Sequence, residues 1–263
     1  MPDAAQPSRS VGGTSPIDYT ATLDFFENRA GLAHGRPANE VVRNWNTGTD
    51  LSARREADEL DRVLPHLPED LPLRVLDVGC GVARWAHVLD GRMRRYVGTD
   101  FAGGIIELAQ RNLSTVAERT ETRLIVCNAA DLATSEVAEF GPFDFVIMGG
   151  VLAYLNDRDV KSCLEAVANM LSSTAVVYMR ESVALGQRLT LDRHWSAELN
   201  GEYSAIYRNA KWYRTVITDV LVGDHRRVLH DQEMDPLLKD HVDTTQHYFI
   251  LGTGQPVTLK SDR

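Results

Sequence analysis

The apolar positions of the chain fall into short runs that alternate with segments of helical period. The apolar runs between residues 73 and 179 have the length of buried strands, and we expect strands at 73–78, 95–99, 123–127, 143–148 and 175–179. Amphipathic segments separate these runs, and we expect helices at 83–89, 103–113 and 157–171, with a shorter one near 135–140. Strands separated by helices imply right-handed crossovers and a parallel sheet covered on both faces.

The first 70 residues lack this alternation. Residues 1–16 contain no apolar core and are expected to form a disordered tail. Residues 17–70 are expected to form a helical cap, because 17–29 and 51–64 carry apolar residues at helical spacing. The α/β domain is expected at 71–255.

The alternation also stops after the fifth strand. Residues at about 181–210 are polar and aromatic without a clear period, which indicates an irregular lid over a ligand site. A helix at 211–219 and strands at 220–229 and 245–251 are expected to follow. The pattern therefore predicts an α/β fold with a doubly wound, seven-stranded sheet.

The stretch 75–86, VLDVGCGVARWA, combines an apolar strand with a turn of small residues. Asp77 lies near the end of the strand, Gly79 and Gly81 follow it, and a helix begins after them. Glycines let a ligand approach the backbone and the positive end of that helix. A buried carboxylate costs free energy unless it meets a donor or a cation. The stretch resembles the first motif of class I S-adenosylmethionine (SAM) dependent methyltransferases, in which this acid serves the ammonium of the cofactor.

The alternative for this stretch is the dinucleotide site of a Rossmann-type NAD(P) oxidoreductase. The G-x-G-x-x-G fingerprint of such sites requires a third glycine where this chain has Arg84. Asp100 lies where either family places a ribose-binding acid, so its spacing does not discriminate. The resemblance to the methyltransferases extends over about 73–251 and implies a Rossmann-like, mostly parallel sheet whose last strand is antiparallel.

The resemblance also implies cofactor-binding residues at the ends of the second and third strands. Asp100 would accept both ribose hydroxyls, and Phe101 would pack on adenine; a helix N-cap and ordinary core packing are the alternatives. Asn128, Ala129 and Asp131 lie where many relatives show D-A-x-D-L and recognise the edge of adenine. Asp131 has an equal claim to capping the following turn.

The fourth strand and its loop, FDFVIMGGVLAYLND, match the same family pattern. Gly149 lies at the ligand-facing end of the strand. Tyr154 occupies a position that is often His, and it is a candidate either for catalysis or for the pocket wall, because the ordinary pKa of tyrosine, about 10, suits a base poorly. In the helical cap, Arg54 is a candidate for the carboxylate of SAM.

Candidates for the acceptor side follow the fifth strand. Glu181 is expected at the mouth of the crevice, where it could accept a proton or hold a hydroxyl group, and Arg180 could bind a carboxylate or phosphate. His194 lies in the expected lid and is a second candidate base. A salt bridge between loops and a surface histidine are the competing interpretations of these residues.

Composition and charge narrow the function classes. A net charge of −9 without a dense Lys/Arg block argues against nucleic acid as the main partner. Three cysteines without C-x-x-C spacing fit a reducing compartment, and neither they nor the acidic residues suggest a metal site. No apolar run reaches the roughly 18 residues that span a bilayer, so we expect no membrane partner and a cytoplasmic location.

Together these patterns predict a SAM-dependent methyltransferase that releases S-adenosyl-L-homocysteine (SAH). The runs GVARWAHVL and YVGTDFAGGII resemble bacterial small-molecule methyltransferases that modify sugars and natural products. We therefore expect transfer to an oxygen or nitrogen of a small polar metabolite, in secondary metabolism such as antibiotic biosynthesis. A non-catalytic SAM-binding protein is the remaining alternative, and exposed cap helices would permit a homodimer.

Overall fold

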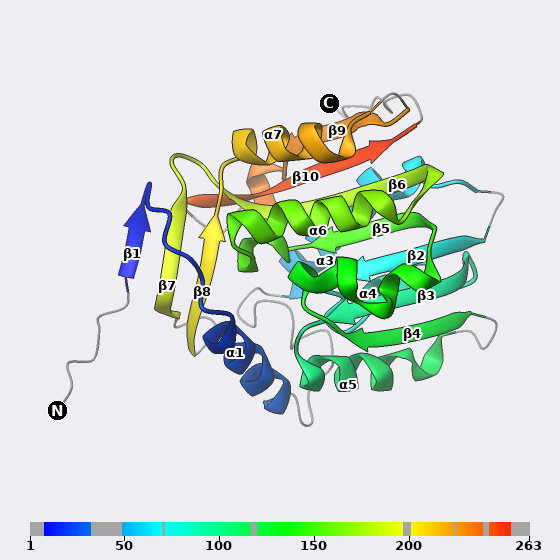
Figure 1. The fold of residues 1–263 in the computed structure, drawn as a ribbon, viewed down its shortest axis with the longest axis horizontal. Helices are drawn as coiled ribbons and strands as arrows, with labels where there is room; N and C mark the ends of the chain where they lie inside the picture. The colour runs from blue at the N-terminus through cyan, green and yellow to red at the C-terminus, as the bar shows by residue number, and fades with distance from the viewer. Residues whose placement is uncertain are drawn as a thin grey trace.

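The computed structural model describes residues 8–32, 49–69, 72–116, 120–196, 201–223, 225–238 and 242–253. Its larger sheet has seven strands in the order β4-β3-β2-β5-β6-β10-β9 (Figure 1). β2 to β6 run parallel, and β10 is antiparallel to both β6 and β9. The strands are β2 (Leu73–Val78), β3 (Met93–Asp100), β4 (Glu121–Val126), β5 (Phe143–Gly149), β6 (Leu171–Ala184), β9 (Arg227–Glu233) and β10 (Thr244–Gly252). This confirms the predicted fold class, including the antiparallel strand.

Helices cover both faces of the sheet because successive residues of a buried strand point to opposite sides. Leu76 and Val146 face α6 and α7, whereas Val75 and Phe145 face α3 and α4. α5 packs beside β4 and against α1. The helices are α1 (Tyr19–Gly31), α3 (Thr49–Val63), α4 (Arg84–Val88), α5 (Gly103–Asn112), α6 (Asp157–Asn169) and α7 (Ala210–Leu221). Short 3-10 helices lie at Leu64–His66, Leu113–Thr115, Ala129–Thr134, Glu136–Phe140, Leu152–Tyr154 and Pro236–Leu238.

A second sheet replaces the irregular lid that the sequence led us to expect. β1 (Ser8–Val11), β7 (Leu189–Ser196) and β8 (Gly201–Tyr207) pair antiparallel in the order β1-β7-β8. Figure 1 shows this small sheet together with α1 at one end of the large sheet. β7 escaped the sequence pattern because three consecutive residues are buried before burial begins to alternate, and Arg193 interrupts the strand with a φ of 49°. Residues 8–11, expected within a disordered tail, form the edge strand.

The C-terminal part also differs from the expectation at one strand. Residues 220–229 were expected to be a strand, but α7 continues to Leu221 and β9 begins at Arg227. Leu221 continues the buried helical stripe of Tyr213 and Ile217, at a spacing of four residues. β9 is an edge strand with exposed polar residues, so its own pattern is weak. Within the described part of the chain, no helix combines the length and apolarity needed to cross a bilayer.

Candidate functional site

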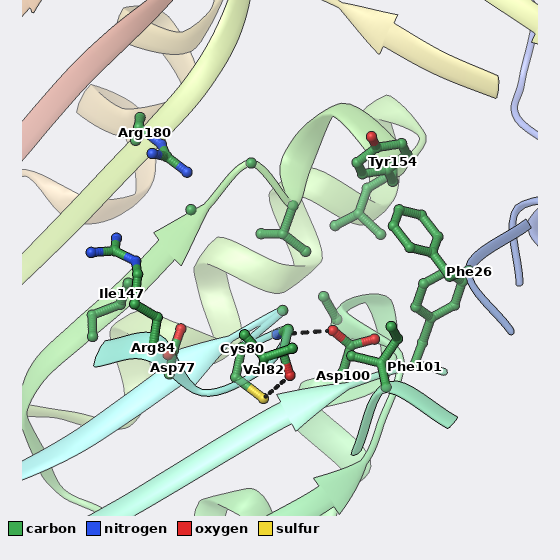
Figure 2. A pocket seen from close by; sticks show the side chains of 18 of the residues that line it. Phe26, Asp77, Cys80, Val82, Arg84, Asp100, Phe101, Ile147, Tyr154 and Arg180 are labelled. Carbon is green, nitrogen blue, oxygen red and sulfur yellow. Dashed lines mark hydrogen bonds between the residues drawn. The ribbon is translucent and has the colours of Figure 1, made fainter. Parts of the chain in front are cut away.

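A cavity of about 320 Å³ lies where the parallel strands β2, β3 and β5 end. Such carboxyl-terminal strand edges are the usual ligand sites of open α/β sheets. α1 closes one side of the cavity with three side chains, Tyr19, Phe26 and Arg29. Figure 2 shows Asp77 and Arg84 grouped on one side of the cavity and Asp100 with Phe101 on the other. The cavity therefore brings the N-terminal cap and the predicted motif residues together.

The turn after β2 has the backbone conformation that glycine favours. Gly79 and Gly81 have φ values of 66° and 55°, and both line the cavity. A Cβ on Gly79 would come within 2.9 Å of a Val151 methyl group. Ala83 adopts the same left-handed conformation, with a φ of 57°, immediately before α4. The turn needs glycine both for its conformation and for the close approach of the loop after β5.

Asp77 is a buried carboxylate at the cavity wall. Its Oδ2 accepts a hydrogen bond of 2.7 Å from the Tyr96 hydroxyl group. Burial raises the pKa of Asp77 to about 7, against the hydrogen bond from Tyr96 and the charge of Arg84. A cation placed beside this carboxylate would favour its ionised form.

Asp100 ends β3 and is held by the backbone of two loops. Its carboxylate accepts hydrogen bonds from the N–H of Gly81, at 3.2 Å, and of Ala102, at 3.1 Å. Burial raises the pKa of Asp100 to about 6, although these donors oppose the shift. The adjacent Phe101 lines the cavity and meets Phe26 of α1 edge to face, with ring centroids 5.5 Å apart.

Of the three residues expected to recognise adenine, all in the segment after β4, two line the cavity and one does not. Asn128 and Ala129 line the cavity, and Asn128 Oδ1 accepts a hydrogen bond from the N–H of Ala130. Asp131 is exposed and is not among the cavity residues. It lies in the first turn of the 3-10 helix Ala129–Thr134, where an acidic residue is favourable.

The structure separates the residues expected on the acceptor side. Gly149 and Tyr154 line the cavity, and burial raises the pKa of Tyr154 to about 12. Glu181 is fully buried away from the expected crevice mouth, and its carboxylate accepts hydrogen bonds from three consecutive backbone N–H groups, residues 151–153. His194 lies on β7 beside the ring of Tyr203, and neither His194 nor the exposed Arg54 of α3 is among the cavity residues.

An ion cluster that the sequence reading missed lies between α3 and the cavity. Glu59 of α3, 1% exposed, accepts hydrogen bonds from Arg84 Nη2 at 2.5 Å and from the Tyr178 hydroxyl group at 2.6 Å. Arg180 Nη1 lies 3.5 Å from the same carboxylate. Burial alone would raise the pKa of Glu59, but Arg180 and Arg84 hold it below its ordinary value. The sequence feature that could have indicated this cluster is Glu59 itself, an acidic residue on the apolar side of an amphipathic helix.

The cavity residues fit the expected cofactor. SAM carries an ammonium group, a carboxylate, ribose hydroxyl groups and adenine. The cavity offers carboxylates, three guanidinium groups and an amide, from Asp77, Asp100, Arg29, Arg84, Arg180 and Asn128. The left-handed glycines leave room for a ligand against the backbone. Within the described residues, no group of three or more His, Cys, Asp or Glu side chains is arranged to hold a metal ion.

Comparison with known proteins adds a family match. Residues 75–174 match the family model described as a methyltransferase domain. This match covers 100 of the 263 residues of the chain. The match begins within β2 and ends within β6, so the N-terminal helices and the small sheet lie outside it. The sequence matches none of the curated proteins with which it was compared.

Solved structures share the fold of this chain. A SAM-dependent methyltransferase from Leishmania major aligns with a TM-score of 0.63 and 14% identity, covering 88% of this chain and 82% of that one. Phosphoethanolamine N-methyltransferase 1 from Haemonchus contortus was solved with phosphoethanolamine and SAH. It aligns with a TM-score of 0.65 and 18% identity, covering 94% of this chain and 51% of that one. The [4+2]-cyclase SpnF aligns with a TM-score of 0.63 and 12% identity, covering 95% of this chain and 100% of that one. The phosphoethanolamine N-methyltransferase binds SAH, and the cyclase has the same fold, so the fold alone does not fix the reaction.

Proposed function

We propose that the protein is a SAM-dependent methyltransferase that transfers a methyl group to an oxygen or nitrogen of a small polar metabolite. The observation that carries the proposal is a pair of carboxylates, the buried Asp77 and the partly buried Asp100, on opposite sides of one cavity beside a glycine turn. Asp77 would hold the ammonium group of the cofactor, and Asp100 would accept its ribose hydroxyl groups. The methyltransferase domain match over 75–174 supports the same assignment.

Bound SAM supplies a methyl group that its sulfonium already activates. The chain must then bind and orient the acceptor and exclude water. The aromatic wall of Phe26, Phe101 and Tyr154 would exclude water from the adenosine side of the cavity. With a pKa near 12, Tyr154 stays protonated at neutral pH and would orient the acceptor as a hydrogen-bond donor. The placement of Glu181 and His194 outside the cavity wall gives no support to either as a base.

Calorimetry with purified protein tests the cofactor part. We expect SAM and SAH to bind and NAD and NADP not to bind, because Arg84 stands where dinucleotide sites need glycine. Asp77→Asn and Asp100→Asn should each weaken SAH binding by about tenfold or more, since each removes a charge-assisted interaction. Absence of heat for SAM and SAH, or unchanged binding in both variants, would refute the proposal.

The acceptor class needs a separate measurement. We expect transfer of a labelled methyl group from SAM to a member of a panel of amino sugars, sugar hydroxyls and polar natural products. The net charge of −9 makes RNA and DNA poor partners, so they serve as negative controls. Salt-dependent nucleic-acid binding would contradict this part, and cofactor binding without turnover on any acceptor would favour a non-catalytic SAM-binding protein.

A further inference from the structure

Arg180 is aimed into the cavity from the centre of the large sheet. It lies on β6, directly beside Gly149 of β5 in the strand register. The guanidinium group passes close to Gly149, because a Cβ placed there would lie 3.8 Å from Arg180 Nη2, and both residues line the cavity. The buried Nε of Arg180 has no hydrogen-bond partner within the described part of the chain. A buried donor of this kind gains free energy when a ligand acceptor reaches it.

Arg84, the neighbouring guanidinium group, is engaged on two sides. Its Nη1 donates to Glu56 at 3.0 Å and its Nη2 to Glu59 at 2.5 Å, and the group lies over the Trp85 ring at 4.9 Å. Arg180, in contrast, approaches Glu59 only at 3.5 Å. Of these two cations, Arg180 retains more donor capacity toward the cavity.

Glu59 fixes the direction in which Arg180 points. Its carboxylate is anchored by the Tyr178 hydroxyl group, and Tyr178 precedes Arg180 by two residues on the same face of β6. Glu59 therefore holds the guanidinium group of Arg180 on the side of the sheet that α3 covers. α3 precedes the matched methyltransferase segment, so this contact joins the N-terminal cap to the cavity wall.

We propose that Arg180 binds the carboxylate of the amino-acid part of SAM, and that Glu59 is the positioning residue that holds Arg180 in place. The inference rests on the proposed function, in which Asp77 receives the ammonium group of the same amino acid. Asp77 and Arg180 lie on β2 and β6, two strands apart across β5, roughly 10 Å at the backbone. The ammonium and carboxylate groups of an α-amino acid are attached to the same carbon, so their two partners must come close together. The long Arg180 side chain spans part of the distance between the strands. A guanidinium group is also the preferred protein partner of a carboxylate.

Two ligands test the proposal by binding alone. SAH contains the amino-acid part, whereas 5′-methylthioadenosine has the adenosine and thioether but lacks both the ammonium and the carboxylate. Arg180→Gln should weaken SAH binding about 10- to 100-fold, the range for a lost hydrogen bond to a charged group. It should change the affinity for 5′-methylthioadenosine by no more than about twofold, because that ligand has no carboxylate for Arg180.

Glu59→Gln should show the same selectivity with a smaller loss, about fivefold or more for SAH alone, because it loosens Arg180 without removing it. Glu56→Gln is the matched control: Glu56 also pairs with Arg84 but not with Arg180, and its substitution should leave both affinities within about twofold. If Glu59→Gln does not fold, Glu59→Asp, which keeps the charge but shortens the reach, should still lose SAH affinity selectively.

The outcomes separate this inference from the proposed function. If the unaltered protein binds neither ligand, the proposed function fails. If it binds SAH but Arg180→Gln leaves SAH affinity unchanged, or weakens both ligands equally, the carboxylate assignment is overturned while the cofactor site stands. If both Glu59 variants bind SAH as tightly as the unaltered protein does, Glu59 is not a positioning residue.

Discussion

At the scale of single residues, Asp77 makes the cavity sensitive to pH near neutrality. Its pKa of about 7 lies far above the ordinary value for aspartate because the carboxylate is buried. Between about pH 4 and 7 the folded protein therefore holds a proton that the unfolded chain releases, so this group lowers stability as pH rises through that window. A bound ammonium group reverses the preference, because it favours the ionised carboxylate.

We predict that the affinity for SAH rises between pH 6 and pH 8, by up to about tenfold per pH unit below the pKa of Asp77. Calorimetric titrations across this range measure it. Asp77→Asn should bind weakly and lose most of the dependence, leaving the part due to Asp100, whose pKa is near 6. An identical pH profile in the variant would show that Asp77 does not face the ammonium group.

Two features favour glycine at position 79, a left-handed backbone and a close neighbour, whereas Gly91 has only the left-handed backbone. Comparing the two positions separates the effects. Gly79 combines a φ of 66° with a Cβ position 2.9 Å from Val151, whereas Gly91 has a φ of 78° and open space around its Cβ position. Gly91→Ala should cost about 1 kcal/mol through the left-handed backbone, and Gly79→Ala about 1–2 kcal/mol more through overlap with Val151. Urea unfolding measures both, and equal losses would mean that the loop after β5 yields without cost.

At the scale of elements, the turn after β5 is clamped from both sides. Glu181 accepts hydrogen bonds from the backbone N–H groups of residues 151–153. The buried Arg208 donates hydrogen bonds to the carbonyl groups of Leu152 and Leu155. The clamp fixes the Leu152–Tyr154 helix, which presents Tyr154 to the cavity. Glu181, which the sequence suggested as a catalytic candidate, thus holds the turn after β5 in place.

We predict that Glu181→Gln lowers the free energy of unfolding by about 1–3 kcal/mol at pH 8, because an amide nitrogen would face backbone donors that the carboxylate now satisfies. The affinity of the folded protein for SAH should change by less than about threefold, because Glu181 is not among the cavity residues. Urea unfolding and calorimetry on the same preparation decide. A large loss of methyl transfer with unchanged stability would instead restore Glu181 as a candidate base.

Element prediction succeeded where burial imposed a pattern and failed where it did not. β2 was predicted at the residues it occupies, because a strand buried on both faces is a continuous apolar run with sharp ends. β8 and β9 carry polar residues and lie in or at the edge of less covered sheets, so their sequences resemble loops. The β1 strand of four residues depends on its pairing with β7, which no local pattern encodes.

At the scale of the whole molecule, contacts between distant segments were the part that the sequence could not predict. The order of motifs along the chain was enough to predict the doubly wound sheet and to place Asp77, Asp100 and Asn128 around one cavity. It gave no means to pair Glu59 with Arg180, since their meeting depends on how α3 packs across the sheet. For the same reason the sequence offered Arg54, on the same helix, as a candidate for the carboxylate of SAM, although the structure shows that it is exposed.

The contribution of α1 to the cavity has a consequence for how such a protein diversifies. Phe26 and Arg29 line the same cavity as the glycine turn, yet they belong to a helix outside the matched residues 75–174. If the cavity binds SAM as proposed, substitutions in α1 can reshape the acceptor side of the cavity without changing the residues at the strand ends. Under the proposed function, we therefore expect relatives that differ in acceptor preference to differ more in α1 than at the ends of β2 and β3.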